Sequence, residues 1–416
     1  MLTSDRGFLG FALVGLAACG STSVTGTPPP TAVAVAYCSG LEPEWVAFQD
    51  GDGAWTRVQP SPPGGKVTFD SRFSTTRGAV ATLNRSGDLT FLSVLYGTPA
   101  ELETVGDTNP RDCGPFDAKT LLGTVAGLNT DEVAFVSGPF FSRVRAGVDN
   151  TFELKALPSG PRDLLGMLTD GRGAVTGFIL RRDVDVPDST TLPVLDFGAP
   201  EAFAPAVANV SILGLGGESA TSGTQVLTGN AEISVTLQTN PTPDVTRPYA
   251  ALPERQLLPG DLQVLSASLS TVTGSPRSAT LYFRAPTDRT LTLGAPLIPP
   301  TFTTVATAPT LQLRAHFVPQ GDYDRSAVIS YQQGITTIVT ISMTAAYAAL
   351  AGDGYDILVP DLSSAAGFDP AWTLRPGETV LWSAGRTGGT LGLGRDVGVS
   401  DGTTRRTAGG IGTLSQ

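Results

Sequence analysis

Apolar and polar residues alternate along much of the chain. Leu311, Leu313, Ala315 and Phe317 alternate with polar residues, and the segment 339–347 repeats the pattern. A period of two predicts strands that bury one face. No stretch shows the amphipathic pattern of a helix longer than two turns. Turn-forming sequences separate the apolar segments at 62–65 (P-P-G-G), 85–88 (R-S-G-D), 158–161 (P-S-G-P), 319–322 (P-Q-G-D) and 375–378 (R-P-G-E).

The composition supports an all-β chain with several cores. Single cores rarely grow beyond about 250 residues, so 416 residues with 41% hydrophobic content predict more than one domain. Only 16% of residues are charged, whereas Gly and Pro number 49 and 32, which favours strands and turns over exposed helices. We therefore predict two or three β-sandwich-like modules after a signal peptide and a flexible linker. The net charge of −11 argues against nucleic acid and anionic membrane surfaces as partners.

The N-terminus has the pattern of an export signal. A short polar start with one cation, Arg6, precedes an apolar run over 7–18 that is too short to span a bilayer. The sequence Leu16-Ala17-Ala18-Cys19 resembles the lipobox of bacterial lipoproteins. This resemblance implies cleavage before Cys19 and acylation of Cys19 with fatty acids such as palmitate. It also implies sorting to the outer membrane, because Gly20 and not Asp follows the cysteine.

The segment after Cys19 is predicted to be a tether. Residues 20–31 contain Gly, Ser, Thr and three prolines, and they offer little apolar surface to bury. More than one acyl chain at Cys19 would attach the protein almost permanently, since each buried CH₂ contributes about 0.8 kcal/mol.

The remaining cysteines form an even pair. With Cys19 acylated, Cys38 and Cys113 are left in an exported chain, which predicts a disulfide. Two buried free thiols are the alternative. Two cysteines and the single histidine, His316, do not complete a zinc site.

The segment from about 122 to 185 carries a second resemblance. It contains N-T-F-E-L-K-A-L-P-S-G-P-R-D-L-L-G-M-L, in which Phe152, Leu154 and Ala156 alternate before a turn at 158–160. This pattern resembles the carboxypeptidase regulatory-like, transthyretin-like sandwich, although Pro161-Arg162-Asp163 stands where an aromatic residue usually begins the next strand. The resemblance implies a β-sandwich and contributes no catalytic residue.

A run of Asp and Gly at 50–53 raises the question of calcium. An EF-hand loop counted from Asp50 would need an oxygen ligand at position 5 and glycine at position 6, where this chain has Ala54 and Trp55. The loop fails this test. Asp-Gly favours tight turns, so we predict a hairpin in which 45–49 pairs with 54–58.

Other candidate sites are incomplete. G-V-S-D-G at 398–402 matches the G-x-S-x-G pattern, but the only histidine precedes it. His316, Asp322 and Asp324 bracket a predicted hairpin end and could approach one another, although solvent exposure is the simpler expectation. We predict no metal, no cofactor and no catalytic residue.

The domain prediction follows from these patterns. We expect a signal peptide at 1–18, the lipidated cysteine and linker at 19–31, a disulfide-containing β domain at 32–117 and a carboxypeptidase regulatory-like domain at 118–187. A second β domain is expected at 188–384. Residues 385–416 contain ten glycines and no aromatic residue, which predicts a flexible tail.

The functional prediction is a cell-envelope lipoprotein that acts as a non-catalytic binding or structural surface. Its partners would be the membrane, through the anchor, and an envelope protein or a glycan. One alternative is a carbohydrate-binding lipoprotein that stacks sugars on Trp45, Trp55, Trp372 or Trp382, although such residues more often fill cores. Another is a hydrolase with dispersed acids such as Asp361 and Asp369.

Overall fold

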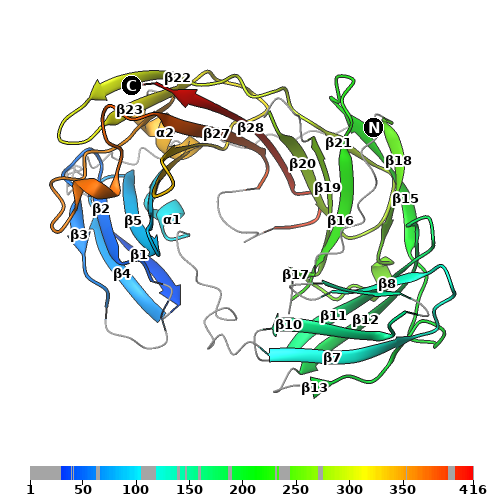
Figure 1. Ribbon diagram of the computed structural model, residues 1–416. Coiled ribbons are helices and arrows are strands. Elements are labelled where there is room, and N and C mark those ends of the chain that lie inside the picture. The colour runs from blue at the N-terminus through cyan, green and yellow to red at the C-terminus, as the bar shows by residue number, and fades with distance from the viewer. Residues whose placement is uncertain are drawn as a thin grey trace, which may run out of the picture.

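The structure of the chain is a computed structural model. It describes residues 30–38, 40, 42–61, 66–104, 119–137, 141–145, 148–157, 161–185, 190–229, 232–233, 244–269, 275–352, 354–391 and 399–415. Strands dominate, as predicted, and the chain forms an arch (Figure 1). The longest helix among the described residues has 7 residues.

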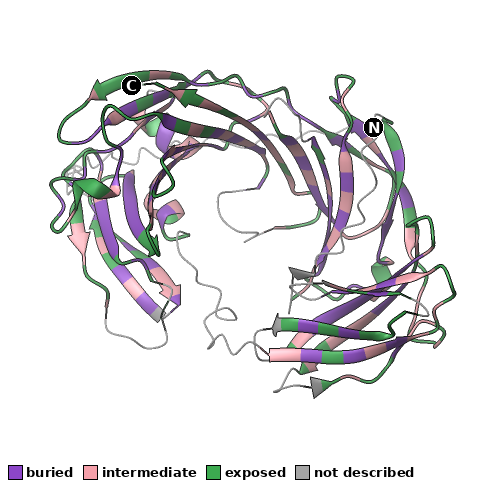
Figure 2. Cartoon of the chain, viewed as in Figure 1, coloured by how far each residue is buried: buried purple, intermediate pink, exposed green. Residues whose placement is uncertain are grey.

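One 12-stranded sheet runs through the arch and joins segments that are far apart in sequence. Neighbouring strands within this sheet are antiparallel except for one parallel pair, β25 with β6. Buried and less buried residues alternate along its strands (Figure 2). In spatial order the strands are β17 (Glu232–Ile233), β16 (Thr221–Leu227), β19 (Leu262–Leu269), β20 (Arg277–Phe283), β28 (Thr404–Leu414), β27 (Val380–Gly389), β24 (Ser326–Gln333), β25 (Thr337–Thr344), β6 (Leu89–Gly97), β5 (Gly78–Ser86), β2 (Trp45–Asp50) and β3 (Thr56–Val58).

Two small sheets cover the outer side of the long sheet (Figure 1). The first consists of β22 (Thr301–Ala306), β23 (Gln312–Phe317) and β26 (Tyr355–Leu358), and it shares a large core with β2, β5, β6, β24, β25 and β27. The second consists of β18 (Thr246–Ala251), β15 (Ala206–Leu213) and β21 (Arg289–Thr292), which pack on β19 and β20.

A two-stranded layer covers one end of the opposite, inner side. Strands β1 (Thr31–Cys38) and β4 (Lys66–Phe73) pair with each other and bury Val33, Val35 and Phe69 against Phe48 and Val80 of the long sheet. The rest of the inner side has no such layer among the described residues.

A separate pair of sheets forms from the segment that resembles the carboxypeptidase regulatory-like domain. Phe152 and Leu154 from one sheet share a core with Val136 and Leu164 from the other. The side chain of Ala156 lies outside the described residues. One sheet contains β10 (Thr151–Leu157), β7 (Lys119–Ala126), β13 (Thr190–Thr191) and β14 (Leu195–Asp196), and the other contains β12 (Val175–Asp185), β11 (Pro161–Thr169), β8 (Val133–Ser137) and β9 (Phe141–Arg145).

A buried ion cluster connects this pair of sheets to the long sheet. The Arg182 guanidinium on β12 donates to Asp163 Oδ2 at 2.7 Å and to Asp261 Oδ2 at 2.6 Å. The side chains of Asp163 and Asp261 are 2% and 3% exposed. Asp183, which has a φ of 50°, donates its backbone N–H to Asp163 Oδ1. Asp163 therefore holds the joint between two modules.

The helices are short. They are α1 (Pro99–Leu102), α2 (Ala345–Ala351), η1 (Glu254–Gln256) and η2 (Pro370–Trp372). The strand predicted through Tyr347 ends at Thr344, whose hydroxyl accepts the Tyr347 N–H at 3.0 Å and starts α2. Gly352 ends α2 with a φ of 83°, a conformation that favours glycine. This part of the strand prediction was wrong because Ala345–Ala351 are good helix formers after an N-cap.

The predicted tail is a strand at the centre of the long sheet. β28 pairs with β20 on one side and with β27 on the other, and β27 itself crosses the predicted boundary at residue 384. The prediction of a flexible tail at 385–416 was therefore wrong. The long sheet also takes strands from both predicted β domains, 32–117 and 188–384, through the β25–β6 pair.

Candidate functional site

The Asp-Gly stretch forms the predicted hairpin. β2 pairs with β3, and Gly51 turns the chain with a φ of 57°. The Asp50 carboxylate accepts the backbone N–H groups of Ser74 at 2.8 Å and Thr75 at 3.1 Å, and it also accepts both hydroxyls. Partial burial acts to raise the pKa of Asp50, but these hydrogen bonds outweigh it and hold the pKa below its usual value. Asp50 thus ties two loops together.

This geometry predicts that Asp50→Asn destabilises the fold by about 2 kcal/mol, because hydrogen bonds to a charged group are lost. The stabilisation from Asp50 is complete above the pKa of the unfolded carboxyl and is lost as the pH falls through the lower folded value. Urea denaturation at neutral and acidic pH measures both effects. Asp52→Asn is the matched control, since Asp52 pairs with Arg77 but its side chain is 77% exposed. Equal losses in the two variants would contradict the assigned role of Asp50.

The structure describes only one of the three cysteines. Cys38 ends β1, is 2% exposed and is not a free thiol. Cys19 and Cys113 lie outside the described residues. Acylation of Cys19 and the Cys38–Cys113 pairing therefore stay predictions.

The four tryptophans do not form a common exposed platform. Trp45 and Trp55 are 3% and 4% exposed and belong to the large core, so the stacking interpretation is wrong for these two. Trp372 is half-buried, and its ring lies 6.0 Å from that of Trp45. Trp382 is half-buried and packs against Phe302 with ring centroids 5.1 Å apart. All four serve core packing.

His316 is exposed, as the simpler expectation had it, and the alternative cluster with Asp322 and Asp324 does not assemble. The exposed His316 lies beside Asp356, with 3.9 Å between Nδ1 and Oδ1. Asp322 accepts the Ala295 N–H, and Asp324 lies beside the Arg325 side chain. Within the described part of the chain, no three His, Cys, Asp or Glu side chains are grouped to hold a metal ion.

The remaining candidates stabilise turns. Asp361 and Asp369 accept backbone N–H groups from Ser363 and Ala371, each at 2.9 Å. Ser400 precedes β28 in a turn where its backbone N–H donates to the Thr403 hydroxyl, and the element that follows it is a strand and not the helix of a nucleophile elbow.

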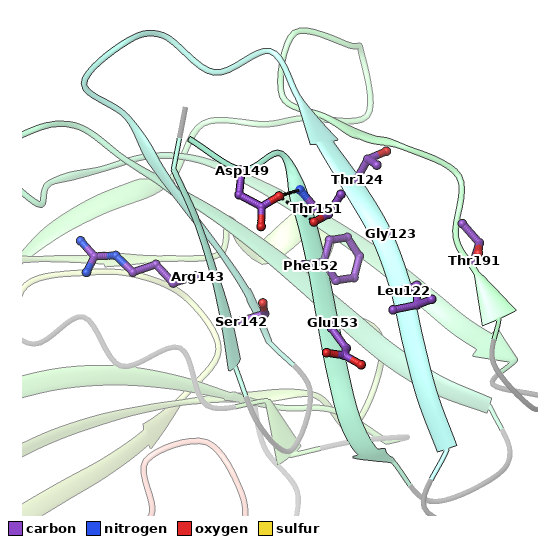
Figure 3. Close-up of a pocket in the computed structure, with 10 residues that line it drawn as sticks. All are labelled: Leu122, Gly123, Thr124, Ser142, Arg143, Asp149, Thr151, Phe152, Glu153 and Thr191. Atoms are coloured by element: carbon purple, nitrogen blue, oxygen red, sulfur yellow. Dashed lines mark hydrogen bonds between the residues drawn. The ribbon is translucent and has the colours of Figure 1, made fainter. Parts of the chain in front are cut away.

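A pocket of about 670 Å³ lies at the edge of the paired sheets (Figure 3). Strands β7, β9, β10 and β13 contribute its walls. Asp149 at its rim accepts the Thr151 N–H and hydroxyl, and these bonds hold the pKa of Asp149 below its usual value. A carboxyl with a lowered pKa is a poor general acid. Phe152 is buried, with its ring directly over Gly123, where a Cβ would come within 2.3 Å of it.

A second pocket, of about 420 Å³, lies between α2 and the turn at 319–324. The Arg386 guanidinium beside it is buried and donates to the carbonyls of Val318 and Tyr323. It also lies 4.2 Å from the centroid of the Tyr355 ring. Through these contacts Arg386 holds the loop at 318–323 against β27. They account for the burial of the Arg386 side chain.

The inner face of the long sheet has a more distinctive chemistry. Strand register places hydroxyl side chains opposite one another across seven neighbouring strands, from β16 to β25. This first hydroxyl row consists of Thr221, Ser268, Ser278, Thr407, Thr387, Ser326 and Thr344. At about 4.8 Å per strand, the row spans about 29 Å.

A second hydroxyl row lies four residues away along the strands, which is about 13 Å. Its members come from five strands. Ser383 and Ser93 are exposed, whereas Thr82, at the β5 end, is 6% exposed. The row consists of Ser383, Ser330, Thr340, Ser93 and Thr82.

Apolar side chains flank the second row. On one side lie Leu381, which is 49% exposed, and the half-buried Ile338 and Phe91, with Gln332 between Leu381 and Ile338. On the other side lie Val328 and Leu95, with Ser342 between them. None of the residues in the two rows or in these flanks is charged, although charged residues make up 16% of the chain. We call this combined surface the inner face.

Hydrogen bonds order the hydroxyls of the inner face. Ser330 and Thr340 lie 2.9 Å apart between their oxygens, and Ser278 and Thr407 lie 2.7 Å apart. At the end of the first row, Thr344 donates to the Glu101 carboxylate at 2.9 Å. Single strands such as 326–333 and 337–344 show alternating hydroxyls in sequence, but only the register aligns them.

Comparisons with known proteins identify no family for this chain. No model of a known protein family matches the chain, and no curated protein matches its sequence. None of the helices in the described ranges is long and apolar enough to cross a membrane.

Proposed function

We propose that this chain is a lipid-anchored protein of the bacterial cell envelope, placed at the outer membrane by its sorting signal, that binds a partner without catalysing a reaction. The lipobox-like sequence that ends at Cys19 supports the anchor. The observation that carries the binding role is the uncharged inner face, where hydroxyls from distant segments are aligned in one sheet. A rigid sheet is suited to present such a surface because its side chains are fixed by pairing on both sides.

Carbohydrate binding is the second candidate function. The hydroxyl rows favour it, whereas the burial of Trp45 and Trp55 removes the stacking surfaces on which it first rested. A hydrolase that uses Asp361 and Asp369 has less support, because both carboxylates are engaged in turns.

The anchor and the inner face can be tested separately in one experiment. Cys19→Ser should release the protein from membranes into the soluble envelope fraction, because acylation requires the cysteine sulfur. This soluble form should still bind isolated envelopes, and adding Thr340→Arg should abolish that binding by placing a charge on the inner face. Sedimentation with envelopes measures both results.

Thr303→Arg, on the exposed outer strand β22, is the control and should leave envelope binding unchanged. Equal membrane partitioning of wild type and Cys19→Ser would refute the anchor. Equal envelope binding with and without Thr340→Arg would refute the role of the inner face.

A further inference from the structure

Extending the proposed binding role, on which this inference rests, we infer that the inner face takes a neutral, extended polysaccharide lying across the strands. The hydroxyl rows run perpendicular to the strands, so a polymer in that direction meets a hydroxyl about every 4.8 Å, except at the row ends where Ser326, Thr344 and Thr82 are buried. A globular ligand would use only part of either row.

The hydroxyls of the inner face can hydrogen-bond to a polar ligand. Each Ser or Thr hydroxyl has one donor and two acceptor lone pairs. In the Ser330–Thr340 and Ser278–Thr407 pairs, one donor is used between the two residues. The second donor and the remaining lone pairs stay available, which suits a ligand whose hydroxyls both donate and accept.

The flanking residues suit the apolar parts of a sugar. Leu381, Ile338 and Phe91 line one side of the second row, about 7 Å away. Sugar rings combine C–H surfaces with hydroxyl edges, so alternating apolar and hydroxyl rows match both. Buried apolar area supplies affinity here, while the hydroxyls fix the orientation.

The composition of the two rows disfavours anionic polymers. A carboxylate or sulfate placed over either row would lose hydration and find no cation among its residues, which is costly. The exposed Arg405 lies two residues from Thr407 on the same face of β28. The acidic net charge of −11 adds long-range repulsion. A second copy of the chain is a weaker fit, because two faces rich in hydroxyls gain little from packing together.

The test uses the full-length Cys19→Ser chain and two probes, linear β-1,4-linked glucose oligomers of graded length and polymers of glucuronic acid. Calorimetry should show binding of the neutral oligomers, with affinity rising until the oligomer spans the row, and no binding of the acidic polymer. Thr340→Val and Thr387→Val should each weaken binding about two- to tenfold, as expected for one lost hydrogen bond. Thr303→Val on the outer layer is the control.

Three results would overturn the inference: no binding of the neutral oligomers, equal binding of the acidic polymer, or unchanged affinity in both inner-face valine variants. Self-association that is lost in Thr340→Arg would assign the surface to a second copy instead. If envelope binding depends on the inner face while neutral oligomers fail to bind, the proposed function stands and only the polysaccharide inference fails. Far-UV circular dichroism of each variant checks that the sheet is intact.

Discussion

A soluble Cys19→Ser chain that ends at Leu391 should show no cooperative unfolding transition. The truncation removes β28, an 11-residue strand that is bonded to β20 and to β27. A strand bonded on both sides contributes on the order of ten backbone hydrogen bonds, each worth about 1 kcal/mol net. That loss is comparable to the whole stability of a domain, about 5–15 kcal/mol.

The loss extends beyond hydrogen bonds. Ala408 lies in the large core, and the Trp382 ring packs over Gly412. Without β28, β20 and β27 would become open sheet edges prone to aggregation. Urea denaturation followed by tryptophan fluorescence measures the outcome, with a chain that ends at Leu414 as the control. An unchanged midpoint in the shorter chain would restore the interpretation of 385–416 as a flexible tail.

Arg182→Met should destabilise the protein by about 3–5 kcal/mol. Removing one partner of a buried ion cluster leaves the charges of Asp163 and Asp261 uncompensated. Burial acts to raise the pKa of Asp163, and the hydrogen bonds from Asp183, Thr228 and Arg182 outweigh it, so the folded pKa lies below the usual value. In the wild type, this carboxylate stabilises the fold above its unfolded pKa, and the effect is lost as the pH falls through the folded value.

In the variant the pH dependence should weaken or reverse. Without the guanidinium, only the hydrogen bonds from Asp183 and Thr228 still oppose the effect of burial on the pKa of Asp163, so the variant should lose more stability at neutral pH than under acid. Chemical denaturation at several pH values tests this prediction. Arg172→Met, at an exposed turn of the same module, is the control and should change little. Partial rescue by adding Asp163→Asn and Asp261→Asn would attribute the loss to charge, and no difference between Arg182→Met and Arg172→Met would contradict the assigned joint.

Local pattern was sufficient for much of the secondary structure. The alternation at 311–317 predicted β23, and the Asp-Gly stretch predicted the β2–β3 hairpin. Both depend on residues that are neighbours in sequence: a period of two buries one face, and glycine permits the backbone angles of a tight turn.

Long-range packing decided the points at which local pattern failed. Glycines disfavour a strand locally, so the segment that contains Gly409 and Gly412 predicted a flexible tail. In the fold, β20 and β27 bond to this segment on both sides, and Trp382 fills the space that a side chain at Gly412 would need. Similarly, Asp163 became a joint residue only because Arg182 and Asp261 meet it from other strands.

By itself, the sequence determined the export signal pattern, the β class and the low charge of this protein, because these depend on composition and local period. It left the inner face hidden: Ser330, Thr340 and Ser383 each occupy an ordinary alternating position in their own strand. Strand order and register brought them into one row, and a shift of any strand by one residue would turn its hydroxyls to the opposite side. Only the tertiary structure could decide this alignment, since register is fixed by the cores on both sides of the sheet and not by the residues of a single strand.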